Sequence, residues 1–125
     1  MERTDGPSDP RLGLGADGER AALREYLRAG YREVARNWRC SIGEVDLIVA
    51  RADLLVFCEV KTRRGTKLGA PFEAVTPLKQ RRVRRLAEAF LLGWRGHASR
   101  VRFDVASVTV HAGSEPHVHV FEDAF

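Results

Sequence analysis

The sequence of 125 residues has only two cysteines and no long apolar run, and both shortages exclude classes of protein. Cys40 and Cys58 are too few for a disulfide framework or a zinc site, and we interpret them as small apolar residues of strands. No apolar run reaches the ~18 residues of a membrane-spanning helix. Residues 1–7 lack the apolar segment of a secretory signal. We therefore expect a cytoplasmic protein that does not enter the membrane.

The chain does have enough apolar residues for one core, together with a surplus of positive charge. Hydrophobic residues make up 44% of the sequence, which excludes a disordered or fibrous protein, and the net charge is +4. A domain usually needs ~100–200 residues, so there is no room for two. Residues 4–10 are rich in Pro, Asp, Gly and Ser. We expect a flexible tail over residues 1–14 and a single domain over residues 15–125.

The spacing of apolar, Gly and Pro residues predicts two helices and five extended segments. The first helix is expected over residues 17–29, with Asp17 as its N-cap. The second is expected to begin at Thr76 and Pro77 and to end near Gly93. Strands are expected over residues 31–40, 43–50, 54–62, 101–110 and 117–121, and a basic loop over residues 63–70. The order α-β-β-β-α-β-β predicts an α/β fold, in which helices flank a mixed central sheet.

Two acidic residues are predicted to face each other across a hairpin. A tight turn at residues 52–53 sets a register that places Asp46 directly opposite Glu59. Opposite residues have Cβ atoms ~4.5–5.5 Å apart, and carboxylates at that distance repel each other. A cation between them removes the repulsion, and oxygen ligands favour Mg²⁺ or Mn²⁺. In the alternative interpretation, Asp46 is a solvated strand residue and Glu59 forms an ordinary surface ion pair with Lys61.

Further polar residues are predicted to lie near this carboxylate pair. Lys61 points to the same face of its strand as Glu59, where it could steady developing charge or orient a nucleophile. Glu19 lies on the apolar stripe of the first helix. The alternative is that it is a first-turn carboxylate that interacts favourably with the helix dipole. Lys79 and Gln80 flank the apolar stripe of the second helix and are expected to look toward the sheet.

Positive charge is concentrated in one part of the sequence. Nearly all ionisable side chains between residues 61 and 85 are basic, whereas residues 103–125 contain no Lys or Arg. A one-sided basic patch is typical of a nucleic-acid-binding surface, although a solvated helix face is the alternative. His117 and His119 share one face of a short strand, but no third metal ligand is evident, and we interpret them as structural. Four arginines are expected to point outward from the second helix: Arg81, Arg82, Arg84 and Arg85.

A set of short motifs between residues 15 and 125 resembles a known family. They are Gly18-Glu19, Ala22, Tyr26-Leu27, Gly30-Tyr31, Asn37-Trp38-Arg39, Gly43-Glu44-Val45-Asp46-Leu47-Ile48, Glu59-Val60-Lys61-Thr62-Arg63, Glu73-Ala74-Val75, Lys79, Arg102-Phe103-Asp104 and Ala124-Phe125. With these motifs the sequence resembles the bacterial YraN-like family, whose members are similar to Holliday-junction resolvases of the PD-(D/E)XK nuclease superfamily. Val45 stands where the superfamily name has proline.

The resemblance implies a restriction-endonuclease-like core of order α-β-β-β-α-β and the parts of a nuclease site. It implies metal ligands at Asp46 and Glu59, a catalytic lysine at Lys61 and an auxiliary acid at Glu19, which would support the metal through a second ion or a water. We therefore expect a Mg²⁺- or Mn²⁺-dependent DNA endonuclease that hydrolyses phosphodiester bonds, with a preference for branched DNA. By analogy with resolvases, branched substrates suggest a homodimer.

The DNA is expected to contact the basic loop, the second helix and one further arginine. These residues are Arg39, Arg63, Arg64, Lys67, Lys79, Gln80, Arg81, Arg82, Arg84 and Arg85. Two alternatives stay open. One is a non-catalytic nucleic-acid-binding module that retains the nuclease fold, and the other is a protein-interaction domain whose basic face meets an acidic partner.

Overall fold

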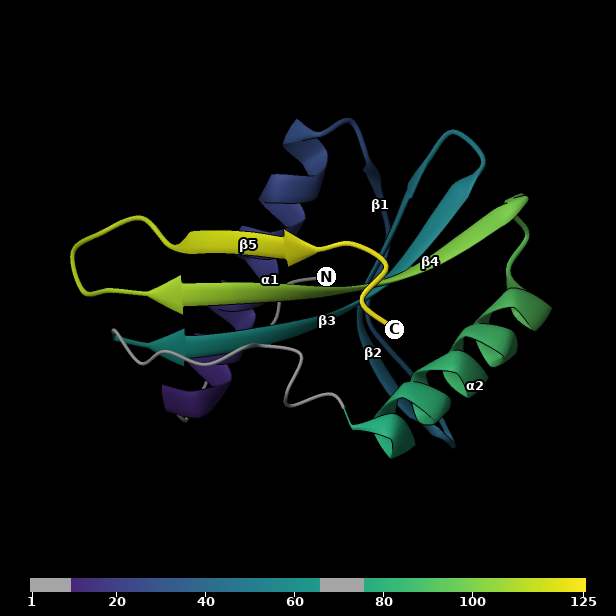
Figure 1. The fold of residues 1–125 in the computed structure, drawn as a ribbon, viewed down its shortest axis with the longest axis horizontal. Helices are drawn as coiled ribbons and strands as arrows, with labels where there is room; N and C mark the ends of the chain where they lie inside the picture. Colours follow the sequence, from purple (N-terminus) through teal and green to yellow (C-terminus); the bar gives the residue numbers. More distant parts are fainter. Residues whose placement is uncertain (1–9, 66–75) are drawn as a thin grey trace, which may run out of the picture.

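The computed structural model describes residues 10–65 and 76–125, and in these it contains two helices and one five-stranded sheet (Figure 1). This arrangement confirms the predicted mixed α/β fold, and it is consistent with a restriction-endonuclease-like fold. Neither helix is long and apolar enough to cross a membrane. In chain order the elements are α1 (Pro10–Arg28), β1 (Arg32–Cys40), β2 (Gly43–Arg51), β3 (Leu54–Arg64), α2 (Pro77–Gly93), β4 (Arg100–Val110) and β5 (His117–Phe121).

The five strands lie in sequence order, β1-β2-β3-β4-β5, and only one pair of neighbours among them is parallel. Strands β1, β2 and β3 form an antiparallel meander, and β4 and β5 form an antiparallel hairpin. The parallel pair is β3 and β4. Parallel neighbours need a long crossover connection, and α2 lies within that crossover.

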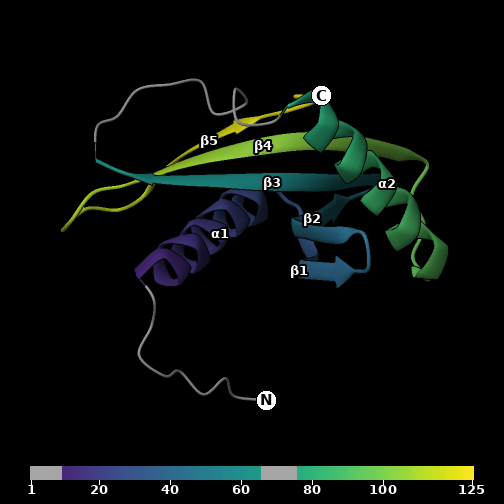
Figure 2. The ribbon, with the colours of Figure 1, turned by 90° about the horizontal axis from the view of Figure 1, so that it is seen from below.

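The two helices cover opposite faces of the sheet (Figure 2). Side chains alternate along β3, so that Val56 and Cys58 pack toward α1 while Leu55 and Phe57 pack toward α2. Continued along the strand, the same alternation places Glu59 and the residues two and four positions after it on the α2 face. The sheet therefore has an apolar core on each face, and one end of the α2 face carries polar side chains.

Helix α1 begins at Pro10, seven residues earlier than the sequence pattern predicts. Asp17 therefore lies within the helix, and its prediction as the N-cap is wrong. Proline is well suited to the first turn of a helix, where its missing N–H needs no partner. Glycines at positions 13, 15 and 18 weaken the helical pattern of this stretch, which is why the early start was missed. Residues 1–9 of the expected tail lie outside the described residues.

Gly18 allows α1 to approach β3 closely. Gly18 is buried, and a Cβ atom built on it would overlap the Thr62 side chain. Gly15 lies in the same helix, but a Cβ atom there would meet nothing within 4 Å. The two glycines therefore carry the same intrinsic helix penalty in different surroundings.

We expect Gly18→Ala to lower the free energy of unfolding by about 1–3 kcal/mol, because the added methyl group overpacks the helix against the sheet. Gly15→Ala should instead raise it by about 0.5–1 kcal/mol through improved helix propensity. Urea unfolding of both variants measures the two effects. Changes of the same sign would contradict the close approach at Gly18.

Candidate active site

Strands β2 and β3 separate at the position of the predicted carboxylate pair. They pair in the predicted register from Arg51 opposite Leu54 to Leu47 opposite Cys58, where the described pairing ends. The next position was predicted to pair two acids directly, and this pairing is wrong. Instead, the Asp46 Oδ2 atom accepts a hydrogen bond from the N–H group of Val60 at 2.8 Å. A carboxylate thus takes the place of a strand partner for β3.

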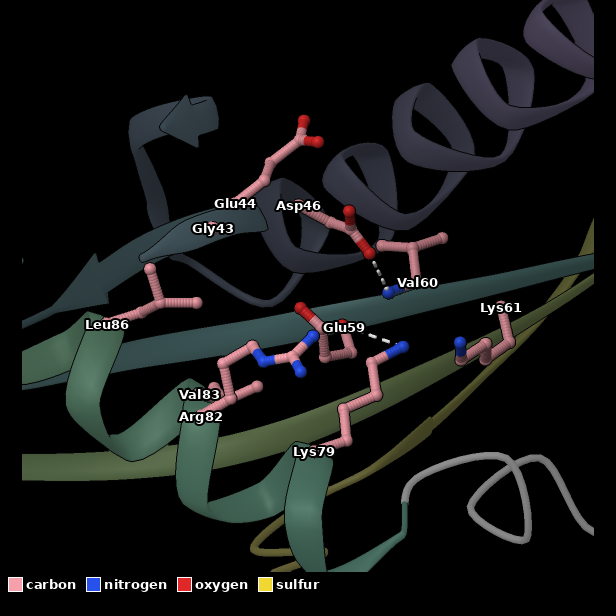
Figure 3. Close-up of a pocket in the computed structure, with 10 residues that line it drawn as sticks. All are labelled: Gly43, Glu44, Asp46, Glu59, Val60, Lys61, Lys79, Arg82, Val83 and Leu86. Carbon is pink, nitrogen blue, oxygen red and sulfur yellow. Dashed lines mark hydrogen bonds and ion pairs between the residues drawn. The ribbon is translucent and has the colours of Figure 1, made fainter. Parts of the chain in front are cut away.

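Asp46 and Glu59 line one pocket of about 370 Å³ (Figure 3). The Glu59 side chain is only 6% exposed, and its Oε1 atom forms an ion pair with Lys79 Nζ at 3.3 Å. Its Oε2 atom is buried and has no hydrogen-bond partner among the described residues. An unsatisfied buried oxygen is costly, so this atom is available to a ligand. The other lining residues are Gly43, Glu44, Val60, Lys61, Arg82, Val83 and Leu86.

Burial and neighbouring carboxylates disfavour the ionised forms of both Asp46 and Glu59. Burial and the nearby Asp46 raise the pKa of Glu59 to about 7. Burial also raises the pKa of Asp46. The charge of Glu44 adds to this increase, whereas the hydrogen bond from Val60 opposes it. Opposite charge favours ionised carboxylates, so a cation between these two groups would relieve both effects.

Two lysines, one from the sheet and one from α2, lie beside the carboxylates. The Thr76 side chain accepts a hydrogen bond from the Lys79 N–H at 3.2 Å, and this N-cap fixes the helix start that carries Lys79. Figure 3 shows Lys79 reaching toward Glu59, with Lys61 beyond it. Burial and the neighbouring Lys79 lower the pKa of Lys61. Burial also acts to lower the pKa of Lys79, but Lys61 and Glu59 together raise it above its usual value.

Glu19 lies in a separate hollow of about 310 Å³ between α1 and β1. Burial raises its pKa, a hydrogen bond with Asn37 opposes the increase, and the charge of Asp46 adds to it. Glu19 is therefore close enough to sense Asp46 electrostatically, but it does not line the pocket that Asp46 and Glu59 share. The other residues of this hollow are Ala16, Arg20, Arg36 and Asn37.

Residues 18–108, which include both carboxylates and both lysines, match the model of a family described as "Uncharacterised protein family UPF0102". The chain belongs to UPF0102, the YraN-like family. Among similar proteins, the UPF0102 protein of Rhodococcus jostii (strain RHA1) is 53% identical over 114 residues, which cover 91% of this chain and 97% of the relative. That of Nocardia farcinica (strain IFM 10152) is 50% identical over 82% of this chain and 81% of the relative. Neither the family description nor these names state an activity.

The similarity also extends to a relative of lower sequence identity. The UPF0102 protein of Caldicellulosiruptor saccharolyticus is 40% identical over 113 residues, covering 90% of this chain and 96% of the relative. The family resemblance predicted from the sequence motifs is therefore confirmed.

In this UPF0102 chain, Lys79 faces the sheet as predicted, and the four arginines of α2 are exposed but have different surroundings. Lys79 and Arg82 line the pocket, whereas the Arg84 guanidinium lies over the Phe103 ring, 4.6 Å from its centroid. Both arginines are exposed as predicted, but the sequence did not predict that Arg82 borders the pocket or that Arg84 packs on a ring. Gln80 is half-buried and is not one of the described residues that line the pocket. The other two arginines of the helix, Arg81 and Arg85, are exposed as predicted and have no such contact with the described residues. The position of Arg82, three residues after Lys79, was the signal that it shares the Lys79 side of the helix.

The remaining basic residues lie on different parts of the molecule. Arg39 is exposed and forms an ion pair with Glu44 at 3.6 Å. Arg63 and Arg64 were expected in a loop, but they extend β3, so their side chains point to opposite faces of the sheet. They therefore cannot contact the same side of a nucleic acid bound on one face. Lys67 lies outside the described residues.

The UPF0102 fold also buries a second carboxylate, but this one has several partners. Asp104 is fully buried, and it accepts hydrogen bonds from the Tyr26 hydroxyl at 2.7 Å and from the Asp123 N–H at 2.9 Å. Arg102 donates from Nε and Nη2, both at 2.8 Å. Asp104 thus joins α1, β4 and the C-terminal residues. Its satisfied oxygens contrast with the unpaired Oε2 atom of Glu59.

Proposed function

We propose that the chain is a divalent-metal-dependent endonuclease that hydrolyses phosphodiester bonds in DNA. The observation that carries the proposal is the buried Oε2 atom of Glu59, which lacks a partner among the described residues and lies in the same pocket as Asp46. The carboxylate oxygens of Glu59 and Asp46 are ligands of the type that Mg²⁺ and Mn²⁺ prefer. The described residues contain no group of three or more His, Cys, Asp and Glu arranged for a metal. Mg²⁺ commonly binds through one or two carboxylates and keeps several waters, so two carboxylates fit it.

Each side chain of the pocket has a role in this proposal. Asp46 and Glu59 would hold the cation, which when bound supplies electrophilic stabilisation of a phosphate. Lys61 would orient the attacking water and stabilise the negative charge that develops on the phosphate. Arg82 would hold a phosphate oxygen at the edge of the pocket, and Lys79 would keep Glu59 in place through their ion pair.

The proposal is tested by incubating purified protein with linear, flap and four-way DNA, with Mn²⁺ and with a chelator. We expect cleavage only with the metal, and faster cleavage of branched DNA. Binding without cleavage would favour the non-catalytic nucleic-acid-binding module instead. The preference for branched DNA and the associated homodimer come from the analogy with resolvases. Light scattering with and without four-way DNA tests the homodimer.

Lys61→Ala should reduce cleavage at saturating DNA by about 100-fold or more, because it removes a group that stabilises charge and positions the nucleophile. In chelator, the slope of log K against log salt for its DNA binding should change by no more than about 0.9, the contribution of one phosphate contact. Single-turnover cleavage and anisotropy measure the two effects. Lys61→Arg keeps the positive charge and should retain more activity than Lys61→Ala, so equal losses in the two variants would contradict a charge-stabilising role.

Arg82 and Arg85 provide a test of phosphate binding by α2. Each phosphate contact contributes about −0.9 to the slope of log K against log salt, so replacing both with alanine should flatten the slope by about 1.8. The matched control is the double replacement of Arg24 and Arg28, which are exposed on α1 and change the net charge equally. The control should keep the wild-type slope. Equal slopes for the two double variants would show that α2 attracts DNA only through overall charge.

A further inference from the structure

The α2 face of the sheet continues beyond the pocket as two rows of polar side chains. Lys61 pairs with Ser107, which pairs in turn with His119. In the next row, Arg63 pairs with Thr109, and Thr109 pairs with His117. Val118 and Val120, which alternate with the histidines, pack toward the α1 core. Both histidines therefore lie on the same face as Lys61 and Glu59.

Helix α2 packs on a different part of this face. Its buried residues contact Leu55 and Phe57 near the start of β3 and Phe103 near the start of β4. The polar rows occupy the other end of β3 and β4 and the neighbouring strand β5. In Figure 1, β3 and β4 point away from α2, and β5 lies beside β4 on that side of the sheet. His117 and His119 are exposed, and Ser107 and Thr109 are half-buried. We call the six residues of the two rows the β3–β5 surface: Lys61, Arg63, Ser107, Thr109, His117 and His119.

The composition of the β3–β5 surface suits a nucleic acid strand. It contains two cationic side chains, two hydroxyl groups and two imidazole rings, and it has no carboxylate. The His119 ring packs on the Phe121 ring with the centroids 4.2 Å apart. Proteins that bind single strands combine cations for the phosphates with aromatic rings on which bases stack, and a sheet face provides such a platform.

We propose that the β3–β5 surface binds a single-stranded segment of nucleic acid that leads into the Asp46–Glu59 pocket. This inference rests on the proposed nuclease function, which it deepens by naming the substrate class. Lys61 and Arg63 bind the phosphates, while an unpaired base stacks on His119. The surface is continuous with the pocket because Lys61 belongs to both. A duplex offers no unpaired base to His119, so the surface favours a strand that has left the duplex.

The test compares a blunt duplex with the same duplex carrying a short single-stranded tail. Affinities are measured by fluorescence anisotropy in chelator, so that cleavage does not contribute. We expect wild-type protein to bind the tailed DNA more tightly, by about fivefold or more for one stacked base. His119→Ala should lose this preference and His119→Phe should keep it, because phenylalanine preserves the ring. His97→Ala is the matched control, since His97 is exposed in the connection before β4, and it should keep the wild-type preference.

A wild-type protein without a preference for the tail overturns the inference, as does a His119→Ala variant that retains it. Loss of the preference in His119→Phe overturns the stacking role. Cleavage of blunt duplex without a tail preference contradicts this inference alone. A tail preference without cleavage in any metal contradicts the proposed endonuclease alone.

Discussion

Glu59→Gln is expected to stabilise the metal-free protein above neutral pH and to abolish its response to Mn²⁺. The pKa of Glu59 is raised from an ordinary 4.5 to about 7, chiefly by burial and by Asp46. The fold therefore favours the protonated acid. This contribution to stability is fully present below the unfolded pKa and is lost as the pH rises through about 7. The loss is on the order of 3 kcal/mol, and glutamine avoids it because it stays neutral while keeping a similar shape.

Thermal melts at about pH 5 and about pH 8, with chelator or with Mn²⁺, separate the two effects. In chelator the variant should melt above wild type at the higher pH and close to it at the lower pH. A metal that binds only the folded state adds about 2.7 kcal/mol at about 100 times its Kd. We expect this gain in wild type at the higher pH and none in the variant. The Glu59→Gln variant should also lose cleavage.

Glu44→Gln is the matched control for this experiment. Glu44 lines the same pocket, but 34% of its side chain is exposed. The control loses the same charge and should keep most of the response to Mn²⁺. A wild-type protein whose melting temperature ignores millimolar Mn²⁺ would count against the metal site.

Asp104→Ala should destabilise the fold by about 3 kcal/mol, because it removes the carboxylate that pairs with the largely buried Arg102 and accepts a hydrogen bond from the buried Tyr26 hydroxyl. The Arg102 side chain is only 16% exposed and forms its ion pair with Asp104 at 2.8 Å. Tyr26 of α1 loses its hydrogen bond in the same variant. Urea unfolding near neutral pH measures the change.

Asp53→Ala is the control for Asp104→Ala. Asp53 also contacts an arginine, Arg100, at 3.3 Å, but this pair lies on the surface beside the β2–β3 turn. Water and salt screen such a pair, so the control should lose far less stability. Equal losses in the two variants would contradict a structural role for the buried Asp104 network.

Local sequence signals predicted the parts of the site that depend on local geometry. The turn at residues 52–53 predicted the register of β2 and β3 correctly up to Leu47 and Cys58. Thr76 and Pro77 predicted the start of α2, which places Lys79 at the pocket. These predictions succeeded because turns and helix caps are determined by neighbouring residues along the chain.

Other features depend on tertiary contacts that no local pattern contains. The Asp46 carboxylate replaces a strand partner of Val60, so the register could not be extended through the site. Arg84 turns to the Phe103 ring, which comes from a distant strand. Asp104 did leave a signal that was missed. It occupies a position that alternation assigns to the same face as two apolar residues, Ala106 and Val108, and an acid there predicts a buried partner.

The hydrogen bond between Asp46 and the Val60 amide also gives the protein an internal reporter. Most amides of a central strand exchange with solvent only when the sheet opens, because a neighbouring strand holds them. The Val60 amide is held by a side chain that is also a candidate ligand. Its deuterium uptake is therefore governed by the position and charge of one carboxylate. A single backbone proton thus connects the local dynamics of β3 to the occupancy of the pocket.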